Sequence, residues 1–170
     1  ATWTLNTTVD VNGDLTHERG SLIRALIPIT VAGDLVTGAN ATWSGLGTTT
    51  FDGSVAATWS DQNSTLQNIG KVAIDGSAKT VTLASNVAAY SIYIGSDDTL
   101  DASAGNYDIT IYDNWVNTNT FVARSGNVNF SATSTSKTIT TAGDDFYELT
   151  FNGIDGGWSF TEPTVLVSND

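Results

Sequence analysis

Apolar and polar residues alternate along most of this chain in short segments. The opening shows the pattern, because Trp3, Leu5, Val9, Val11 and Leu15 are spaced as one face of strands that break near Asn12-Gly13. A period of two is typical of β-strands with one buried face. Similar segments recur about every 8–12 residues between Gly, Asn, Asp or Ser clusters. In the second half, this pattern predicts strands at 81–87, 89–94, 107–116, 120–123, 127–131, 136–140 and 146–152.

One apolar run, 22–31, is also compatible with a short helix from Glu18 to Ile27 that Pro28 would end. No other stretch has the pattern of a long amphipathic helix. Thr, Ser, Asn and Gly are abundant, and these residues favour turns and strand surfaces over helices. We therefore expect strands and turns at 22–31 as well, and an all-β fold throughout.

The closing segment, 158–170, resembles the opening one, 3–14, and a weaker copy lies at 81–87. The three copies start 78 and 77 residues apart (81 − 3 and 158 − 81). Segment 29–36 matches 109–116 at a similar offset. Self-similarity at a fixed period indicates a repeat architecture. We expect a single domain, 1–170, with internal repeats at 3–80 and 81–157 and the start of a third at 158–170.

Two architectures fit these repeats. One is a parallel β-solenoid in which each coil stacks on the one before, and the other is a pair of small β-sandwich domains. A repeat of ~78 residues is short for a sandwich of ~100 residues. A solenoid can stop at any coil, whereas a sandwich cannot stop after one strand. The sequence therefore favours a parallel β-solenoid (β-helix) built from two ~78-residue tandem repeats.

The composition excludes several classes of function. The net charge is −12, which disfavours nucleic acid because phosphate binding needs clustered Lys and Arg. No apolar run approaches membrane-spanning length, so we expect no membrane insertion. The absence of Cys excludes disulfides and thiolate chemistry. The absence of Met suggests that Ala1 is not a translation start, so we expect a processed form or a piece of a longer chain.

Segments 99–115, 126–130, 137–140 and 146–153 resemble the repeats of very large secreted bacterial surface proteins, which are filamentous-haemagglutinin-like and pectin-lyase-like β-solenoids. The resemblance covers most of 81–160 and, more loosely, 3–80, and the first repeat departs from it at 16–27. It implies an extracellular, right-handed parallel β-helix that serves as a stalk, adhesin or fibre.

Several acidic groups could bind calcium. The densest cluster is Asp97, Asp98 and Asp101, with Asp144 and Asp145 as a second. These residues lie in turn-like segments, where Asp is favoured for local hydrogen bonding, so solvated turns are the preferred interpretation. The segment 10–14 has Asp at calcium-loop spacing but lacks the required Gly and the final carboxylate, which indicates a turn. We expect no cofactor, and Ca²⁺ is the one ion the cluster suggests.

The remaining chemistry is sparse. His17 is the only histidine, and no elbow motif marks a nucleophile for it to serve. The match of Trp3 to Trp158 suggests buried apolar positions. Trp43 and Trp59 have weaker equivalents, so they are the candidates for exposed rings that contact a glycan.

We therefore expect a non-catalytic, structural module of an extracellular fibre, stalk or adhesin, secreted or attached to the cell surface. Its partner would be another copy stacked end to end, or further repeats of the same chain. Alternatives are a β-helix enzyme that degrades polysaccharide and a carbohydrate-binding module. The strands expected to form the stacking ends contain, at one end, Trp3, Leu5, Val9 and Val11 and, at the other, Trp158, Phe160, Val165 and Val167. We expect the four residues of the closing strand to be buried.

Overall fold

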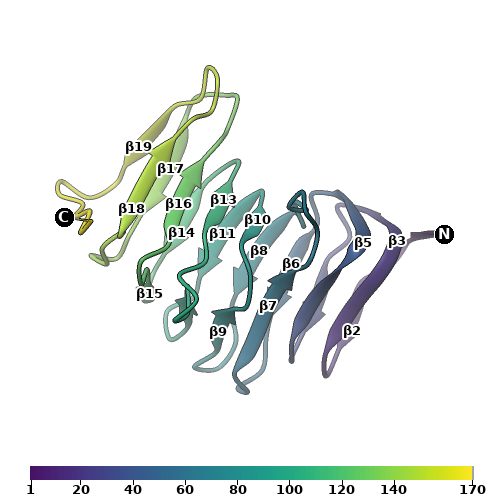
Figure 1. The fold of residues 1–170 in the computed structure, drawn as a ribbon. Coiled ribbons are helices and arrows are strands. Elements are labelled where there is room, and N and C mark those ends of the chain that lie inside the picture. The colour runs from purple at the N-terminus through teal and green to yellow at the C-terminus, as the bar shows by residue number, and fades with distance from the viewer. Residues whose placement is uncertain (170) are drawn as a thin grey trace.

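The computed structural model describes residues 1–169 and contains nineteen strands and no helix within them. The strands form three sheets that run along one coiled stack, and every strand pair is parallel (Figure 1). A β-sandwich requires antiparallel sheets, so the alternative of two sandwich domains is wrong. The predicted parallel β-solenoid is confirmed, with eight strands in its longest sheet.

The three sheets form the sides of the coil. The seven-stranded sheet contains β1 (Thr2–Thr4), β3 (Leu15–Ala25), β5 (Leu35–Gly45), β7 (Ala57–Asp61), β9 (Thr80–Leu83), β12 (Thr99–Asp101) and β15 (Thr120–Val122). The eight-stranded sheet contains β2 (Val9–Val11), β4 (Ile29–Val31), β6 (Thr48–Phe51), β8 (Lys71–Ile74), β11 (Ser91–Ile94), β14 (Trp115–Asn117), β17 (Lys137–Thr140) and β19 (Trp158–Phe160). The four-stranded sheet contains β10 (Val87–Ala89), β13 (Ile109–Ile111), β16 (Asn127–Phe130) and β18 (Glu148–Phe151).

The structural repeat is one coil. Paired residues on neighbouring strands lie between 19 positions apart, as in Ile109 with Val128, and 24 positions apart, as in Trp115 with Ile139. The ~78-residue repeat is not confirmed as a structural unit. Trp3 and Trp158 begin its first and third copies, but Trp3 lies in the seven-stranded sheet and Trp158 in the eight-stranded sheet.

Inward-facing side chains form rows along the coil axis. Pairing through the eight-stranded sheet aligns one residue from each strand, and six of these eight side chains are apolar and lie in or against the core. Each fully buried Ile or Val contributes about 2 kcal/mol through loss of contact with water. The row is Val9, Ile29, Thr49, Val72, Ile92, Trp115, Ile139 and Phe160.

The ambiguous run 22–31 belongs to strands, as expected. β3 pairs with β5 along its length, with an irregularity between His17 and Arg19 where the strand turns a corner. Arg24 points inward and is almost fully buried. Its guanidinium donates hydrogen bonds to the carbonyls of Gly47 (2.7 Å) and Ile69. These two acceptors lie on the next two coils, so the side chain ties three coils together.

Candidate functional site

The structure does not gather the predicted calcium ligands at one point. Asp98 is buried and faces the preceding coil, where it accepts hydrogen bonds from the backbone N–H of Gly76 (3.1 Å) and Lys79 (2.7 Å). Asp97 accepts one from Ala78 (3.1 Å) on that same coil. Asp101 faces the other way, toward the following coil. Among residues 1–169, no group of three or more His, Asp or Glu side chains is arranged to hold a metal ion.

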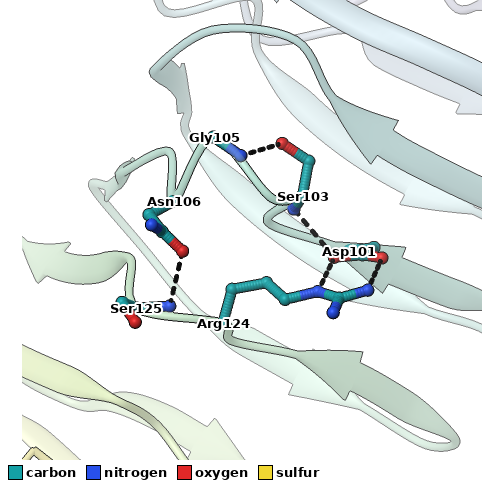
Figure 2. Close-up of polar contacts among 6 residues, drawn as sticks. All are labelled: Asp101, Ser103, Gly105, Asn106, Arg124 and Ser125. Carbon is teal, nitrogen blue, oxygen red and sulfur yellow. Dashed lines mark hydrogen bonds and ion pairs between the residues drawn. The ribbon is translucent and has the colours of Figure 1, made fainter.

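Asp101 instead forms an ion pair with Arg124 at the corner where the chain leaves the seven-stranded sheet (Figure 2). The Asp101 carboxylate accepts hydrogen bonds from Nε (2.9 Å) and Nη2 (2.8 Å) of Arg124, and from the backbone N–H of Ser103 (2.7 Å). The Arg124 hydrogen bonds are the main cause of the lowered pKa of Asp101. One position further on, the N–H of Ser125 donates to Asn106 (3.0 Å). This corner therefore connects consecutive coils.

Lys79 occupies a second corner, between the eight-stranded and seven-stranded sheets. Its side chain is fully buried, and Nζ donates to the carbonyl of Ala32 (2.5 Å), two coils away. Burial lowers the pKa of Lys79, while the nearby carboxylates of Asp52, Asp34 and Asp98 oppose that shift. The ammonium group thus supplies positive charge inside a column of acidic turns.

The other acidic candidates also make contacts between coils. The Asp10 carboxylate accepts a hydrogen bond from the Thr30 hydroxyl (2.7 Å), and Asp14 accepts one from the N–H of Asp34 (2.9 Å). Asp144 accepts hydrogen bonds from the Phe121 N–H (2.5 Å) and from Asn117 Nδ2 (2.9 Å). Segment 10–14 is therefore the end of strand β2 followed by a turn at 12–14, and the carboxylates of Asp10 and Asp14 bind the next coil.

His17 is buried between two tryptophan rings near the N-terminal end of the stack. Its ring lies edge-on to Trp3 and Trp43, with centroids 6.0 and 5.4 Å away. Neither ring nitrogen has a hydrogen-bond partner, and burial lowers the pKa of the imidazole. The neutral form is therefore favoured, and the ring acts as part of the apolar packing.

The two tryptophans proposed as glycan contacts are buried, which corrects that prediction. Trp59 is fully inside the stack, and Trp43 is 8% exposed with its Nε1 donating to Thr37 Oγ1 (3.0 Å). A sugar needs an open ring face, and neither residue offers one. Each lies between two polar residues, an alternation that could have marked both as inward-facing. Trp3, expected to be buried, is 47% exposed.

The two ends of the stack carry the largest uncovered apolar groups. At the N-terminal end, Leu5, Val9 and Val11 are half-buried below the exposed Trp3. An open, apolar hollow of about 320 Å³ lies there, lined by Trp3, Leu15, Thr16, His17, Glu18, Arg19 and Leu22. This end therefore presents apolar side chains that have no coil beyond them.

The C-terminal end is similar in character. Trp158 and Val165 are half-buried, but Phe160 and Val167 are 39% and 48% exposed, which corrects the expectation that both are buried. No coil within residues 1–169 covers these two side chains. The sequence pattern also missed Phe151, which is 48% exposed and packs against Trp158 with centroids 5.5 Å apart. Phe151 pairs with the buried Phe130 on the preceding coil, and this register is visible only in the structure.

The residues after β19 do not form a full strand. Val167 makes a single parallel bridge to Phe146, where the Phe146 N–H donates to the Leu166 carbonyl (3.1 Å) and the Ser168 N–H donates back to Phe146 (2.9 Å). Val165 and Val167 therefore cover the buried Phe146 rather than extending β19. The strand edge of the eight-stranded sheet at this end is β19 alone.

The ends also differ in charge. Positions 138–169 contain five carboxylates and no Lys or Arg. The first 24 residues contain two basic residues, Arg19 and Arg24, and three carboxylates, Asp10, Asp14 and Glu18. Arg19 is exposed at the rim of the N-terminal hollow. The five acidic residues are Asp144, Asp145, Glu148, Asp155 and Glu162.

Comparison with protein-family models, with curated proteins and with solved structures gives no match for this chain. Within residues 1–169, no helix is long and apolar enough to cross a membrane. The fold, and the side-chain contacts at its corners and ends, are therefore the basis on which a function can be assigned.

Proposed function

We propose that this protein is a structural, non-catalytic module of an extracellular fibre, stalk or adhesin, in which solenoids stack end to end. The observation that carries the proposal is the pair of ends that no coil within residues 1–169 covers. Each end combines an unpaired parallel strand edge with apolar side chains aligned with the interior, Val9 at one end and Phe160 at the other. Soluble proteins usually protect such edges, because an open edge is a template for pairing with another chain.

The use of charge within the coil supports a structural role. Asp98, Asp101 and Asp144 all accept hydrogen bonds from neighbouring coils. Lys79 and Arg24 are buried, and Nζ of Lys79 and Nη2 of Arg24 donate to backbone carbonyls of other coils. These side chains join coils to one another. A stack built in this way is a stiff rod, with eight coils spanning on the order of 35 Å at ~4.8 Å per coil.

The extracellular location is supported by the resemblance of 99–153 to repeats of secreted surface proteins. A low share of charged residues, 14%, and a chain rich in Thr, Ser and Asn fit that setting. Without Cys, the rod depends on burial and ladder hydrogen bonds alone, so its stability is independent of redox conditions.

The proposal is tested by measuring the molar mass of the chain over a wide concentration range with light scattering, followed by negative-stain electron microscopy. We expect the mass to rise in multiples of 17.8 kDa, and the particles to lengthen at constant width. A mass of 17.8 kDa at every concentration would rule out self-stacking. A Phe160→Asp variant serves as the control, because a carboxylate at the apolar end should reduce association at least tenfold without altering the buried core.

A further inference from the structure

The eight-stranded sheet has two open edges, β2 at its N-terminal end and β19 at its C-terminal end. All its strands run in the same direction, so a second copy in the same orientation presents β2 to β19 as a parallel partner. We infer that copies join in one specific register, in which β2 of one copy extends the eight-stranded sheet of the next beyond β19. This inference rests on the proposed end-to-end stacking and specifies its contact.

The register follows from the rows inside the sheet. Val9 and Phe160 are the first and last members of the same inward row, so the extended sheet places Val9 of one copy on Phe160 of the next. The outward row that begins with Asp10, which pairs with Thr30, ends at Thr140 and Thr161. Thr161 continues that row, because its N–H donates to the Ile139 carbonyl (3.0 Å) and its hydroxyl donates to that of Thr140 (2.9 Å). Asp10 and Thr161 should therefore become direct neighbours across the junction.

A second copy fits these ends better than an unrelated protein does. Extending the row needs a parallel strand followed by a coil of matching cross-section, which the N-terminal end of this chain provides. A contact between two different ends of the same molecule does not close on itself, so it produces a linear filament.

Cysteine cross-linking tests the register, because the chain has no Cys of its own. In the variant with Asp10→Cys and Thr161→Cys, the two Cα atoms would lie ~4.8 Å apart across the junction. That spacing is within the range of about 4.4–6.8 Å in which disulfides form. The two positions lie at opposite ends of one molecule, so any disulfide between them links different copies. Both side chains are exposed, so the substitutions leave the buried core unchanged.

The matched control is Asp10→Cys with Ser159→Cys. Ser159 is exposed and points outward two positions earlier in β19, so its Cα would lie about 8 Å from the Cα at position 10, beyond disulfide reach. Under mild oxidation, we expect at least ten times more linked multimers with Thr161→Cys than with Ser159→Cys. Reduction should return both variants to the mixture of sizes seen for the parent chain.

The outcomes separate the register from the proposed function. Linked multimers that depend on Thr161→Cys support the inference. If light scattering shows multimers but the two double-cysteine variants form disulfide-linked species equally, or not at all, the proposed register is wrong and end-to-end stacking is retained. A chain that remains at 17.8 kDa by scattering would overturn both.

Discussion

Arg124 binds the Asp101 carboxylate through two hydrogen bonds, 2.9 Å from Nε and 2.8 Å from Nη2, and so joins two consecutive coils. The contact lowers the pKa of Asp101 in the folded state. A carboxyl with a lowered folded pKa stabilises the fold above its unfolded pKa of ~3.9, and that contribution is lost as the pH falls through the folded pKa.

We therefore expect Asp101→Asn to lower the thermal midpoint at pH 6, with the difference from the parent chain shrinking toward pH 3. Since Arg124 is well exposed, the effect should be small and should weaken in 1 M NaCl. Asp155→Asn, at an exposed carboxyl on the C-terminal coil, is the control and should show neither dependence. The thermal midpoints are measured by circular dichroism at several pH values and salt concentrations. A difference between Asp101→Asn and the parent chain that does not change with pH would contradict the role of the ion pair.

Lys79→Met should be strongly destabilising. The substitution keeps the buried stem but removes the hydrogen bond to Ala32 and the positive charge near Asp52, Asp34 and Asp98. Removing one partner of a buried charged group leaves the others uncompensated, which costs about 3 kcal/mol. Urea unfolding gives the free energy directly. Lys71→Met is the matched control, because Lys71 is exposed in β8, and its change should stay within about 0.5 kcal/mol. Equal effects in the two variants would show that the buried ammonium is dispensable.

Acidification should loosen the N-terminal coil through His17. Burial between Trp3 and Trp43 lowers its folded pKa below the ordinary value of 6.5. The fold therefore favours the neutral ring. The contribution of the neutral imidazole to the free energy of unfolding is complete above pH 6.5 and declines as the pH falls below that value. The charged neighbours on its own strand are Glu18 and Arg19, and Arg24 lies over the far ring, Trp43, 5.3 Å from its centroid.

The measurement is amide hydrogen exchange at pH 7.5 and 5, corrected for intrinsic rates. We expect protection of β1 and of the start of β3 to fall at pH 5, and this loss to be absent in His17→Gln, which has no charge to acquire. Carboxyls with lowered pKa values titrate below about pH 4, outside this window. Unchanged protection in the parent chain would contradict the assignment.

The buried Trp59 provides a test of the core. Trp59→Ala should cost about 3–5 kcal/mol, because it leaves a large cavity beside Phe51, whose ring centroid is 6.1 Å away. Trp59→Phe should cost only about 1 kcal/mol, since the Nε1 of Trp59 has no hydrogen-bond partner to lose. Trp3→Ala is the control, with a smaller loss because that ring is half exposed. Sugars should leave the tryptophan fluorescence of the chain unchanged, and quenching by a glycan would revive the carbohydrate-binding alternative.

The period-two pattern of apolar residues predicted much of the fold. The predicted strands 120–123, 127–131 and 136–140 correspond to β15, β16 and β17. The single strand predicted at 107–116 is two strands, β13 and β14, because its apolar pattern hides the corner at 112–114. β12 was missed because only Leu100 of its three residues points inward.

The candidate site was harder to predict. Spacing along the chain cannot show that Asp98 faces one coil and Asp101 the other, because that depends on where each corner turns. The match between 3–14 and 158–170 suggested equal positions for Trp3 and Trp158, but coils of 19 to 24 residues place them in different sheets. Strands β2 and β19 form the two edges of the eight-stranded sheet, and their role in assembly stays a prediction.

The most direct test of the account is the axial repeat of assembled material, measured by electron cryomicroscopy of filaments grown at high concentration. Eight coils at ~4.8 Å predict one copy about every 38 Å along the axis, with all copies in the same orientation and the eight-stranded sheet continuous through each junction. Copies that pack side by side, alternate in direction, or never form a filament would contradict end-to-end stacking.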